Sequence, residues 1–215
     1  MARLFHYHYW TPRVEEMERC YLACDFKLNQ RVGRVPGAEW RRWDMCNWAE
    51  LRKRNVMLRI IEMVMGEVNV TFGMGKQDLF DHVGFQVDED GMLAICKRAV
   101  LKGWPVERNE RRTFITTPWT FRVELMLQPV IEEPSNCRIR SLTMAVHGDL
   151  APVGELAQLL DIPMFTQPDS LRLSDGEWEW IIHSGEKTRV EEVRLATPSA
   201  SVSVTDPVGV RLLLG

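Results

Sequence analysis

Residues 80–88 read Phe80-Asp81-His82-Val83-Gly84-Phe85-Gln86-Val87-Asp88, and this stretch decides the fold. Apolar residues alternate with polar or small ones, which is the period of a strand with one buried face. The residues from Gly91 to Lys102 then predict an amphipathic helix that Gly103 closes. Short strands are expected at 105–108, 112–116 and 120–127. The predicted order is therefore one strand, one helix and three strands.

The same order precedes this unit. Residues 5–10 form an aromatic-rich strand by composition and period, and a helix follows Pro12 and runs to Leu22. Three more strands are expected at 26–32, 56–64 and 67–72. The segment 33–55 interrupts the pattern with glycines, a proline and three tryptophans, Trp40, Trp43 and Trp48. We interpret it as an insertion and a candidate lid.

A third region follows a break rich in proline and acidic residues. We expect a domain at 1–130, a linker at 131–137 and a second domain at 138–215. The second domain opens with strand 141–147 and helix 152–160. Its later strands, expected at 170–173, 177–183, 190–196, 200–205 and 209–214, have no further helix between them. The C-terminal domain is thus predicted to repeat the plan once and then to lose a helix.

Composition narrows the class of function. The chain has 215 residues, 45% of them apolar and 27% charged, with a formal net charge of -3. This profile gives no electrostatic case for nucleic acid or for an anionic membrane surface. Five cysteines, an odd number, do not suggest a disulfide framework. The polar N-terminus and the lack of a long apolar run lead us to expect a cytoplasmic protein.

These patterns resemble the vicinal-oxygen-chelate (VOC) superfamily of glyoxalases, extradiol dioxygenases and bleomycin-resistance proteins. Tandem strand-helix-three-strand (βαβββ) modules are the layout of that superfamily. Residues 81–88 resemble the opening strand of its second module. Residues 117–125, Thr-Pro-Trp-Thr-Phe-Arg-Val-Glu-Leu, resemble its last strand, with Thr117 and Thr120 in place of the usual Asp and Gly. His6 and the helix after it are similar to the opening of the first module.

The resemblance implies an α+β fold in which two βαβββ modules form a half-open β-barrel, with a degenerate VOC-like repeat at the C-terminus. It also implies a divalent metal bound by His6, His82 and Glu124. In the C-terminal repeat, Leu213 occupies the register of the glutamate, so no second metal site of this type is expected there. Zn, Fe, Ni, Co and Mn all accept imidazole and carboxylate ligands, and the sequence does not choose among them.

The ligand set bears on the reaction. Two imidazoles and one carboxylate leave about three positions open on an octahedral ion, enough for a substrate with two adjacent oxygens. Where many relatives supply a further glutamate, strand 67–72 offers Asn69 or Thr71, or Glu67 if the register slips. The set is therefore more similar to extradiol dioxygenases than to glyoxalase I. A lyase, a dioxygenase and a non-catalytic, bleomycin-resistance-like binder all remain open.

Other side chains are candidates for supporting roles. His8 shares the strand face of His6 and is an alternative ligand or a nearby base, so we assign catalytic roles to Glu124 and His8. Arg111, Arg112 and Trp119 are candidates to orient an anionic or aromatic substrate. Glu62 is expected to be paired rather than catalytic. The expected partner is a small molecule, with neither nucleic acid nor membrane, and both a monomer and a homodimer are open.

Overall fold

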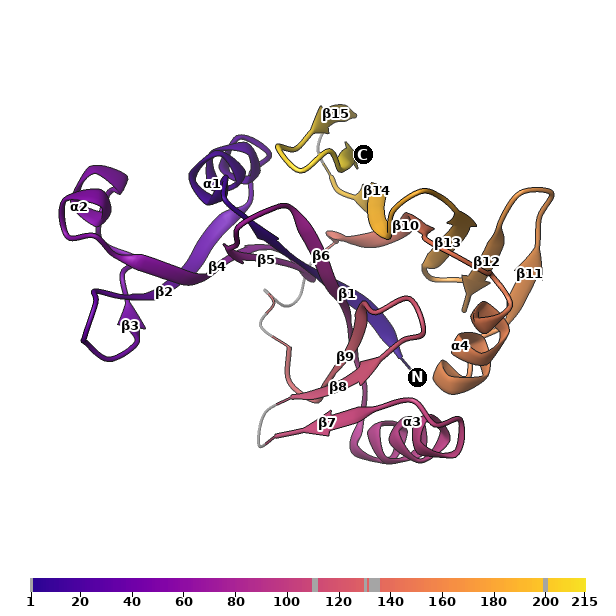
Figure 1. Cartoon of the computed structure of the whole chain (residues 1–215). Coiled ribbons are helices and arrows are strands. Elements are labelled where there is room, and N and C mark those ends of the chain that lie inside the picture. Colours follow the sequence, from indigo (N-terminus) through magenta and orange to yellow (C-terminus); the bar gives the residue numbers. More distant parts are fainter. Residues whose placement is uncertain (1, 110–111, 130, 132–135, 199–200) are drawn as a thin grey trace.

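The computed structural model describes residues 2–109, 112–129, 131, 136–198 and 201–215. It contains two mixed sheets, of nine and seven strands, and four helices in this described part. The first sheet and its three helices precede residue 127, and the second sheet and the fourth helix follow residue 137 (Figure 1). Residues 127–137 separate the two sheets and include the expected linker 131–137, of which residues 132–135 lie outside the described residues.

The first sheet has the strand order β3-β2-β4-β5-β1-β6-β9-β8-β7. Its strands are β1 (Arg3–Thr11), β2 (Lys27–Arg34), β3 (Arg41–Arg42), β4 (Met57–Met65), β5 (Val68–Met74), β6 (Leu79–Gln86), β7 (Val106–Arg108), β8 (Thr113–Thr116) and β9 (Arg122–Met126). Its helices are α1 (Val14–Ala23), α2 (Trp48–Lys53) and α3 (Glu89–Leu101). Apart from β3 and α2, this is the expected tandem of two βαβββ modules, which meet where β1 pairs with β6.

The second sheet has the order β11-β12-β13-β10-β14-β16-β15. Its elements are β10 (Arg138–Val146), α4 (Pro152–Leu160), β11 (Met164–Thr166), β12 (Leu171–Ser174), β13 (Glu179–Ser184), β14 (Arg189–Ala196), β15 (Val202–Thr205) and β16 (Arg211–Leu214). As predicted, the described residues between β14 and β16 contain no helix. The order matches seven strands of the first sheet, with β10 in the place of β1 and β14 in the place of β6.

Sequence reasoning missed three local features. The segment 33–55 is an insertion that carries β3 and α2, and α2 begins with a capping box between Asn47 and Glu50. Helix α3 begins at Glu89, two residues earlier than expected, because the Asp88 side chain accepts a hydrogen bond from the backbone of Gly91. Strand β11 was not predicted, since three residues beside Pro163 are too few to show a period.

The two halves share one core. Trp180 on β13 is fully buried and contacts Phe85 of β6 and Phe121, with ring centroids 5.9 Å apart in each pair. Helices α3 and α4 also touch, because the Arg98 side chain donates to the carbonyl of Leu159. Aromatic rings bury the largest apolar areas of any side chain, so these contacts fasten the second sheet to the first.

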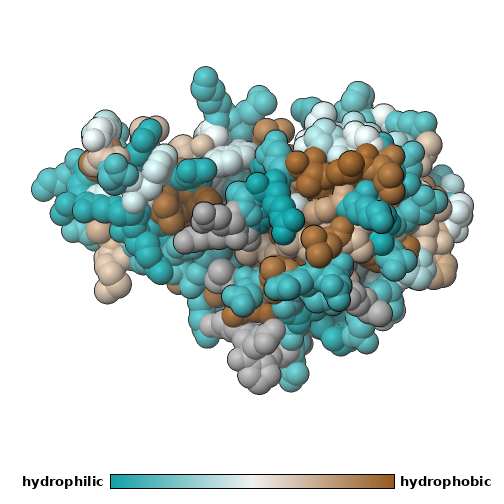
Figure 2. All heavy atoms as spheres, turned by 90° about the horizontal axis from the view of Figure 1, so that it is seen from below, coloured by the Kyte–Doolittle hydropathy of each residue, from teal (hydrophilic) through white to brown (hydrophobic). Residues whose placement is uncertain are grey.

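The face drawn in Figure 2 is mainly hydrophilic, with apolar groups showing between the polar ones. The five cysteines, Cys20, Cys24, Cys46, Cys96 and Cys137, are free thiols. Among the described residues, no helix combines the length and the apolar character that crossing a membrane requires.

Candidate metal centre

Three strands at the middle of the first sheet bring the predicted ligands together. Strand β6 pairs with β1 on one side and with β9 on the other, so His6, His82 and Glu124 lie on three neighbouring strands. Their ligand atoms lie within 4.8 Å of one another, and all three side chains are buried. The Nε2 atoms of His6 and His82 are 3.0 Å apart. Glu124 Oε2 lies 3.3 Å from His82 Nε2 and 3.6 Å from His6 Nε2.

Hydrogen bonds fix which ring nitrogen of each histidine faces this point. His6 Nδ1 lies 3.0 Å from the carbonyl of Asn69, which only accepts, so Nδ1 carries the proton. His82 Nδ1 donates in the same way to the carboxylate of Asp81 at 2.6 Å. When both rings are neutral, each therefore turns the lone pair of Nε2 toward the other. Two lone pairs at this distance repel unless a proton or a metal cation lies between them, and the donor set suits a metal ion.

Burial and the neighbouring charges shift the pKa values of the three side chains in different directions. Burial holds the pKa of His6 at about 4, so its imidazole is neutral and able to coordinate. Burial by itself would also lower the pKa of His82, but its hydrogen bonds with Asp81 and Glu124 raise it above the ordinary value. For Glu124, burial opposes ionisation, yet the neighbouring imidazoles bring its pKa down to about 2. Glu124 Oε1 has no hydrogen-bond partner among the described residues.

Gly84 makes room for the first predicted ligand, His6. It lies opposite His6 in the pairing of β1 with β6. A Cβ atom at position 84 would stand 2.8 Å from the Cβ and 2.9 Å from the Cδ2 of His6. Real carbon atoms do not approach so closely, so only glycine leaves the His6 ring where it is.

Asp81 holds the second predicted ligand, His82, in place. Its carboxylate accepts from His82 Nδ1 and also from the guanidinium of Arg122. Burial tends to raise the pKa of Asp81, but these two partners lower it well below its ordinary range. A carboxylate behind a ligating imidazole fixes the tautomer and the ring orientation. The series Arg122, Asp81 and His82 thus reaches from the sheet surface to the candidate metal position.

Thr71 occupies the position in the first module that Glu124 has in the second. His82 pairs with Arg122, and Glu124 is two residues further along β9. In the same manner His6 pairs with Asn69, and Thr71 is two residues further along β5. Many relatives have a further glutamate ligand in the first module, and we call its place the fourth position. Of the alternatives open in the sequence, the register places Thr71 there. Thr71 Oγ1 lies 3.4 Å from His6 Nε2. Because threonine has no carboxylate, Glu124 is the one carboxylate among the four positions.

His8 lies beside the centre rather than in the three-residue group. Its ring stacks on that of His82, with centroids 4.9 Å apart and planes 4° apart. Its Nδ1 is bonded to Thr71 Oγ1 at 2.6 Å, and its buried Nε2 has no partner among the described residues. Burial lowers the pKa of His8 well below its ordinary value, so the ring is neutral.

Two cavities border the centre. The larger, about 550 Å³, is lined by His6 and Glu124 together with Phe5, Gln30, Glu62, Asn69, Thr71, Arg112, Met126, Leu127 and Gln128. The other, about 430 Å³, lies beside His8 and His82. Arg112 lines both cavities, and its guanidinium is 3.5 Å from Glu124 Oε1. Volumes of this size suit small-molecule ligands.

The other residues that the sequence analysis proposed for the site have different outcomes. As expected, Glu62 is paired, since it is buried and accepts hydrogen bonds from Asn29, Gln30 and Asn69. Arg111 lies outside the described residues. Trp119 lines neither cavity, because its Nε1 donates to the carbonyl of Asp149 and its ring stacks on Phe121. Sequence analysis did not single out Gly84, Asp81 or Arg122, whose roles depend on pairing across strands.

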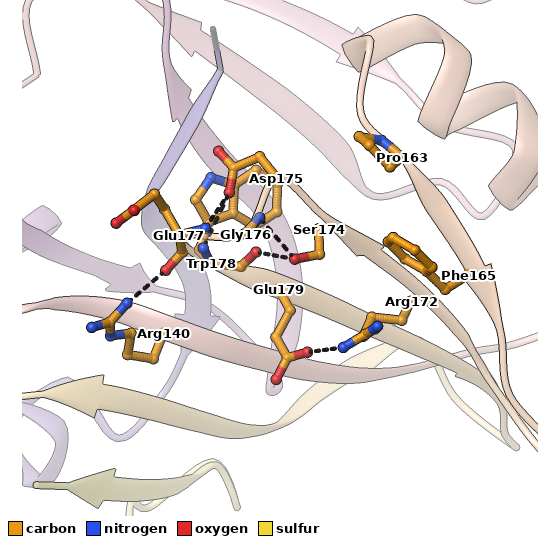
Figure 3. A pocket seen from close by; sticks show the side chains of 10 residues that line it. All are labelled: Arg140, Pro163, Phe165, Arg172, Ser174, Asp175, Gly176, Glu177, Trp178 and Glu179. Carbon is orange, nitrogen blue, oxygen red and sulfur yellow. Dashed lines mark hydrogen bonds and ion pairs between the residues drawn. The ribbon is translucent and has the colours of Figure 1, made fainter.

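The corresponding positions of the second sheet carry other residues than the three predicted ligands. Pairing in β10, β14 and β16 follows β1, β6 and β9, including the register shifts. By that correspondence Ser141 replaces His6, Glu192 replaces His82 and Leu213 replaces Glu124. A cavity of about 590 Å³ on this sheet is lined by residues that bond to one another through side chains and backbone (Figure 3). There Arg172 pairs with Glu179, and Arg140 donates to the carbonyl of Glu177.

Comparison with solved structures resolves the fold. Homoprotocatechuate 2,3-dioxygenase from Arthrobacter globiformis aligns over the whole chain and 80% of its own length, with a TM-score of 0.68 and 10% identity. A Mn(II)-bound glyoxalase from Novosphingobium aromaticivorans aligns over the whole chain and 82% of its own, with a TM-score of 0.68 and 9% identity. The chain has the vicinal-oxygen-chelate fold.

Further VOC structures agree. The 2,2',3-trihydroxybiphenyl 1,2-dioxygenase from Sphingomonas wittichii covers the whole chain with 90% of its own length, a TM-score of 0.65 and 12% identity. Identities this low establish the fold and leave the reaction open. No protein-family model and no curated protein matches the sequence. The VOC expectation for residues 4–128 and for the C-terminal repeat is thereby confirmed at the level of the fold.

Proposed function

We propose that this VOC-fold protein is a divalent-metal-dependent enzyme that acts on a small substrate with two adjacent oxygens. The observation that carries the proposal is the convergence of His6 Nε2, His82 Nε2 and a Glu124 oxygen, with both Nδ1 atoms held by acceptors. If His6 were only a hydrogen-bonded core residue, its Nε2 atom would not be expected to face the Nε2 atom of a second histidine. Structural neighbours that are dioxygenases and a manganese glyoxalase support the same class.

A metal bound here would act as a Lewis acid toward the substrate oxygens and, as iron, would also offer a position for O₂. The chain's own residues then supply binding and exclusion of water. The 550 Å³ cavity reaches His6 and Glu124 and is walled by Phe5, Met126 and Leu127. These walls desolvate a substrate next to the ligands, which strengthens every polar contact that it makes there.

The count of carboxylates favours the dioxygenase type over the glyoxalase type. With Thr71 in the fourth position, Glu124 is the one carboxylate among the ligand positions. A lyase of the glyoxalase type uses a metal-bound carboxylate as its base. Here that base would have to be Glu124, and the metal would then lose its one carboxylate ligand. Two histidines and one carboxylate are the set typical of non-haem iron oxygenases.

His8 is proposed as the proton-handling group beside the substrate. Its ring is neutral and its Nε2 lacks a partner among the described residues. Because Nδ1 is bonded to the Thr71 hydroxyl, the ring is held in one orientation. A positioned neutral imidazole within reach of a substrate hydroxyl is a suitable general base.

Elemental analysis of the purified protein tests the proposal. We expect near-stoichiometric metal, lost in His6→Ala, His82→Ala and Glu124→Ala and retained in His183→Ala, which removes a histidine that pairs with Glu191 on the second sheet. Iron as the retained metal would support oxygen chemistry. A native protein that binds no divalent metal even after reconstitution would refute the proposal and leave a non-catalytic binder of the bleomycin-resistance type.

A further inference from the structure

The smaller of the two cavities beside the candidate metal centre is lined by more arginine and aromatic side chains than the larger one. We call it the arginine cavity and define it by Trp10, Trp40, Arg59, Arg112, Phe114 and Arg122. His8 and His82 also line it, so it opens directly beside the candidate metal centre. Three guanidinium groups and three aromatic rings around about 430 Å³ make a site for a flat, negatively charged molecule.

Positive charge in the arginine cavity exceeds negative charge. Asp81 is the one carboxylate that the described residues contribute to its lining, and it is already engaged by His82 and Arg122. Arg59 has no carboxylate within ion-pair distance among the described residues, and its guanidinium lies 5.5 Å from the centre of the Trp40 ring. Since arginine cannot lose its proton in a protein, this charge is permanent and available to an anion.

A buried polar atom in the same wall lacks a partner. His8 is 3% exposed, and its Nε2 makes no hydrogen bond with any described residue. A buried ring nitrogen left unpaired costs free energy, so such an atom points to a ligand that completes it. The unpaired nitrogen of His8 is a second observation, separate from the charge of the arginines, and His8 lines the same cavity.

The rings set the shape of the ligand. Arg122 lies over the ring of Phe114 at 4.2 Å, and Arg34 over that of Trp40 at 4.5 Å. Trp40 belongs to the inserted segment 33–55, which therefore contributes a wall to this cavity. Aromatic walls backed by guanidinium groups favour a planar ring system over an aliphatic chain.

We propose that the arginine cavity binds an aromatic carboxylate, with the carboxylate held by Arg59 and Arg112 and the ring between Trp10, Trp40 and Phe114. The inference deepens the proposed function, because it names the class of molecule that reaches the same candidate metal centre through its second cavity. It rests on that function for its link to the metal. Binding itself does not require the metal, because every residue named here belongs to the cavity wall.

Isothermal titration calorimetry with 2-naphthoate and its neutral amide, 2-naphthamide, tests the proposal on the protein as purified and after treatment with a chelator. We expect naphthoate to bind more tightly than naphthamide in both states. Arg59→Gln should weaken naphthoate about five-fold, as suits one exposed charge pair, and leave naphthamide unchanged. Trp40→Leu should weaken both ligands alike, because it removes the ring wall and no charge.

Arg140→Gln is the matched control, since it removes the same charge from the cavity of the second sheet. Equal affinities for naphthoate and naphthamide, or equal losses in Arg59→Gln and Arg140→Gln, would overturn the proposal. The chelated protein separates this outcome from that of the metal test. Anion binding can fail while metal is bound, and it can persist if no metal is found.

Discussion

Asp206 offers the sharpest test of how the two halves hold together. It begins the turn before β16 and is buried where the second sheet meets α1. Tyr21 donates to its Oδ2 at 3.1 Å, and the Tyr7 hydroxyl lies 2.8 Å from that of Tyr21. Its Oδ1 accepts from the backbone of Val208 and Val210. Despite these donors, burial raises the pKa of Asp206 from 3.8 to about 6.

The free-energy consequence can be worked out from the shift. A difference of about two pKa units corresponds to about 3 kcal/mol between the ionised and neutral forms. Because the folded-state pKa is the higher one, the folded protein binds this proton more tightly than the unfolded chain does. Stability from this group is therefore present below about pH 4 and is lost as the pH rises through about 6.

We predict that Asp206→Asn removes this pH dependence. An asparagine keeps an oxygen for the two backbone N–H groups and carries no charge. Its free energy of unfolding, relative to the native protein, should improve by about 2–3 kcal/mol between pH 4 and pH 8. Urea denaturation at intervals of half a pH unit, on metal-free samples of both proteins, measures the difference curve.

Asp175→Asn is the control, because Asp175 also accepts two backbone N–H groups in a turn but is only half-buried. It separates the loss of a turn carboxylate from the effect of burial. A difference curve for Asp206→Asn that is flat with pH, or that falls as the pH rises, would refute the reasoning that burial dominates at this site.

Three further predictions concern the metal centre and the core. Gly84→Ala should fold but lose affinity for metal by about ten-fold or more, measured by competition with a chelating dye, because its Cβ displaces the His6 ring; Gly154→Ala, with nothing closer than 4.0 Å, is its control. Asp81→Asn should lower metal affinity about 10- to 100-fold with little change in fold, and unchanged affinity would show that His82 needs no partner. Trp180→Ala should cost about 3–5 kcal/mol in urea denaturation, near the lower value because its buried Nε1 has no partner among the described residues.

Local pattern predicted most of the elements in their order. Residues 80–88 alternate with the period of a strand, and the residues after them have the period of an amphipathic helix. Both patterns depend only on residues a few positions apart, so they can be read from the sequence. The motifs around His6, His82 and Glu124 placed all three on strands, and β1, β6 and β9 carry them. Short elements without a full period, such as β11 and α2, could not be seen in this way.

The sequence by itself thus determined the succession of strands and helices, the superfamily resemblance and the three ligand candidates. Tertiary structure alone decided that Thr71 takes the fourth position, that Gly84 clears space for His6 and that Asp81 orients His82. It also gathered Arg59, Arg112 and Arg122 around one cavity. These relations depend on the register between strands, and a side chain's partner across a sheet is set by the pairing of two distant segments rather than by its own neighbours.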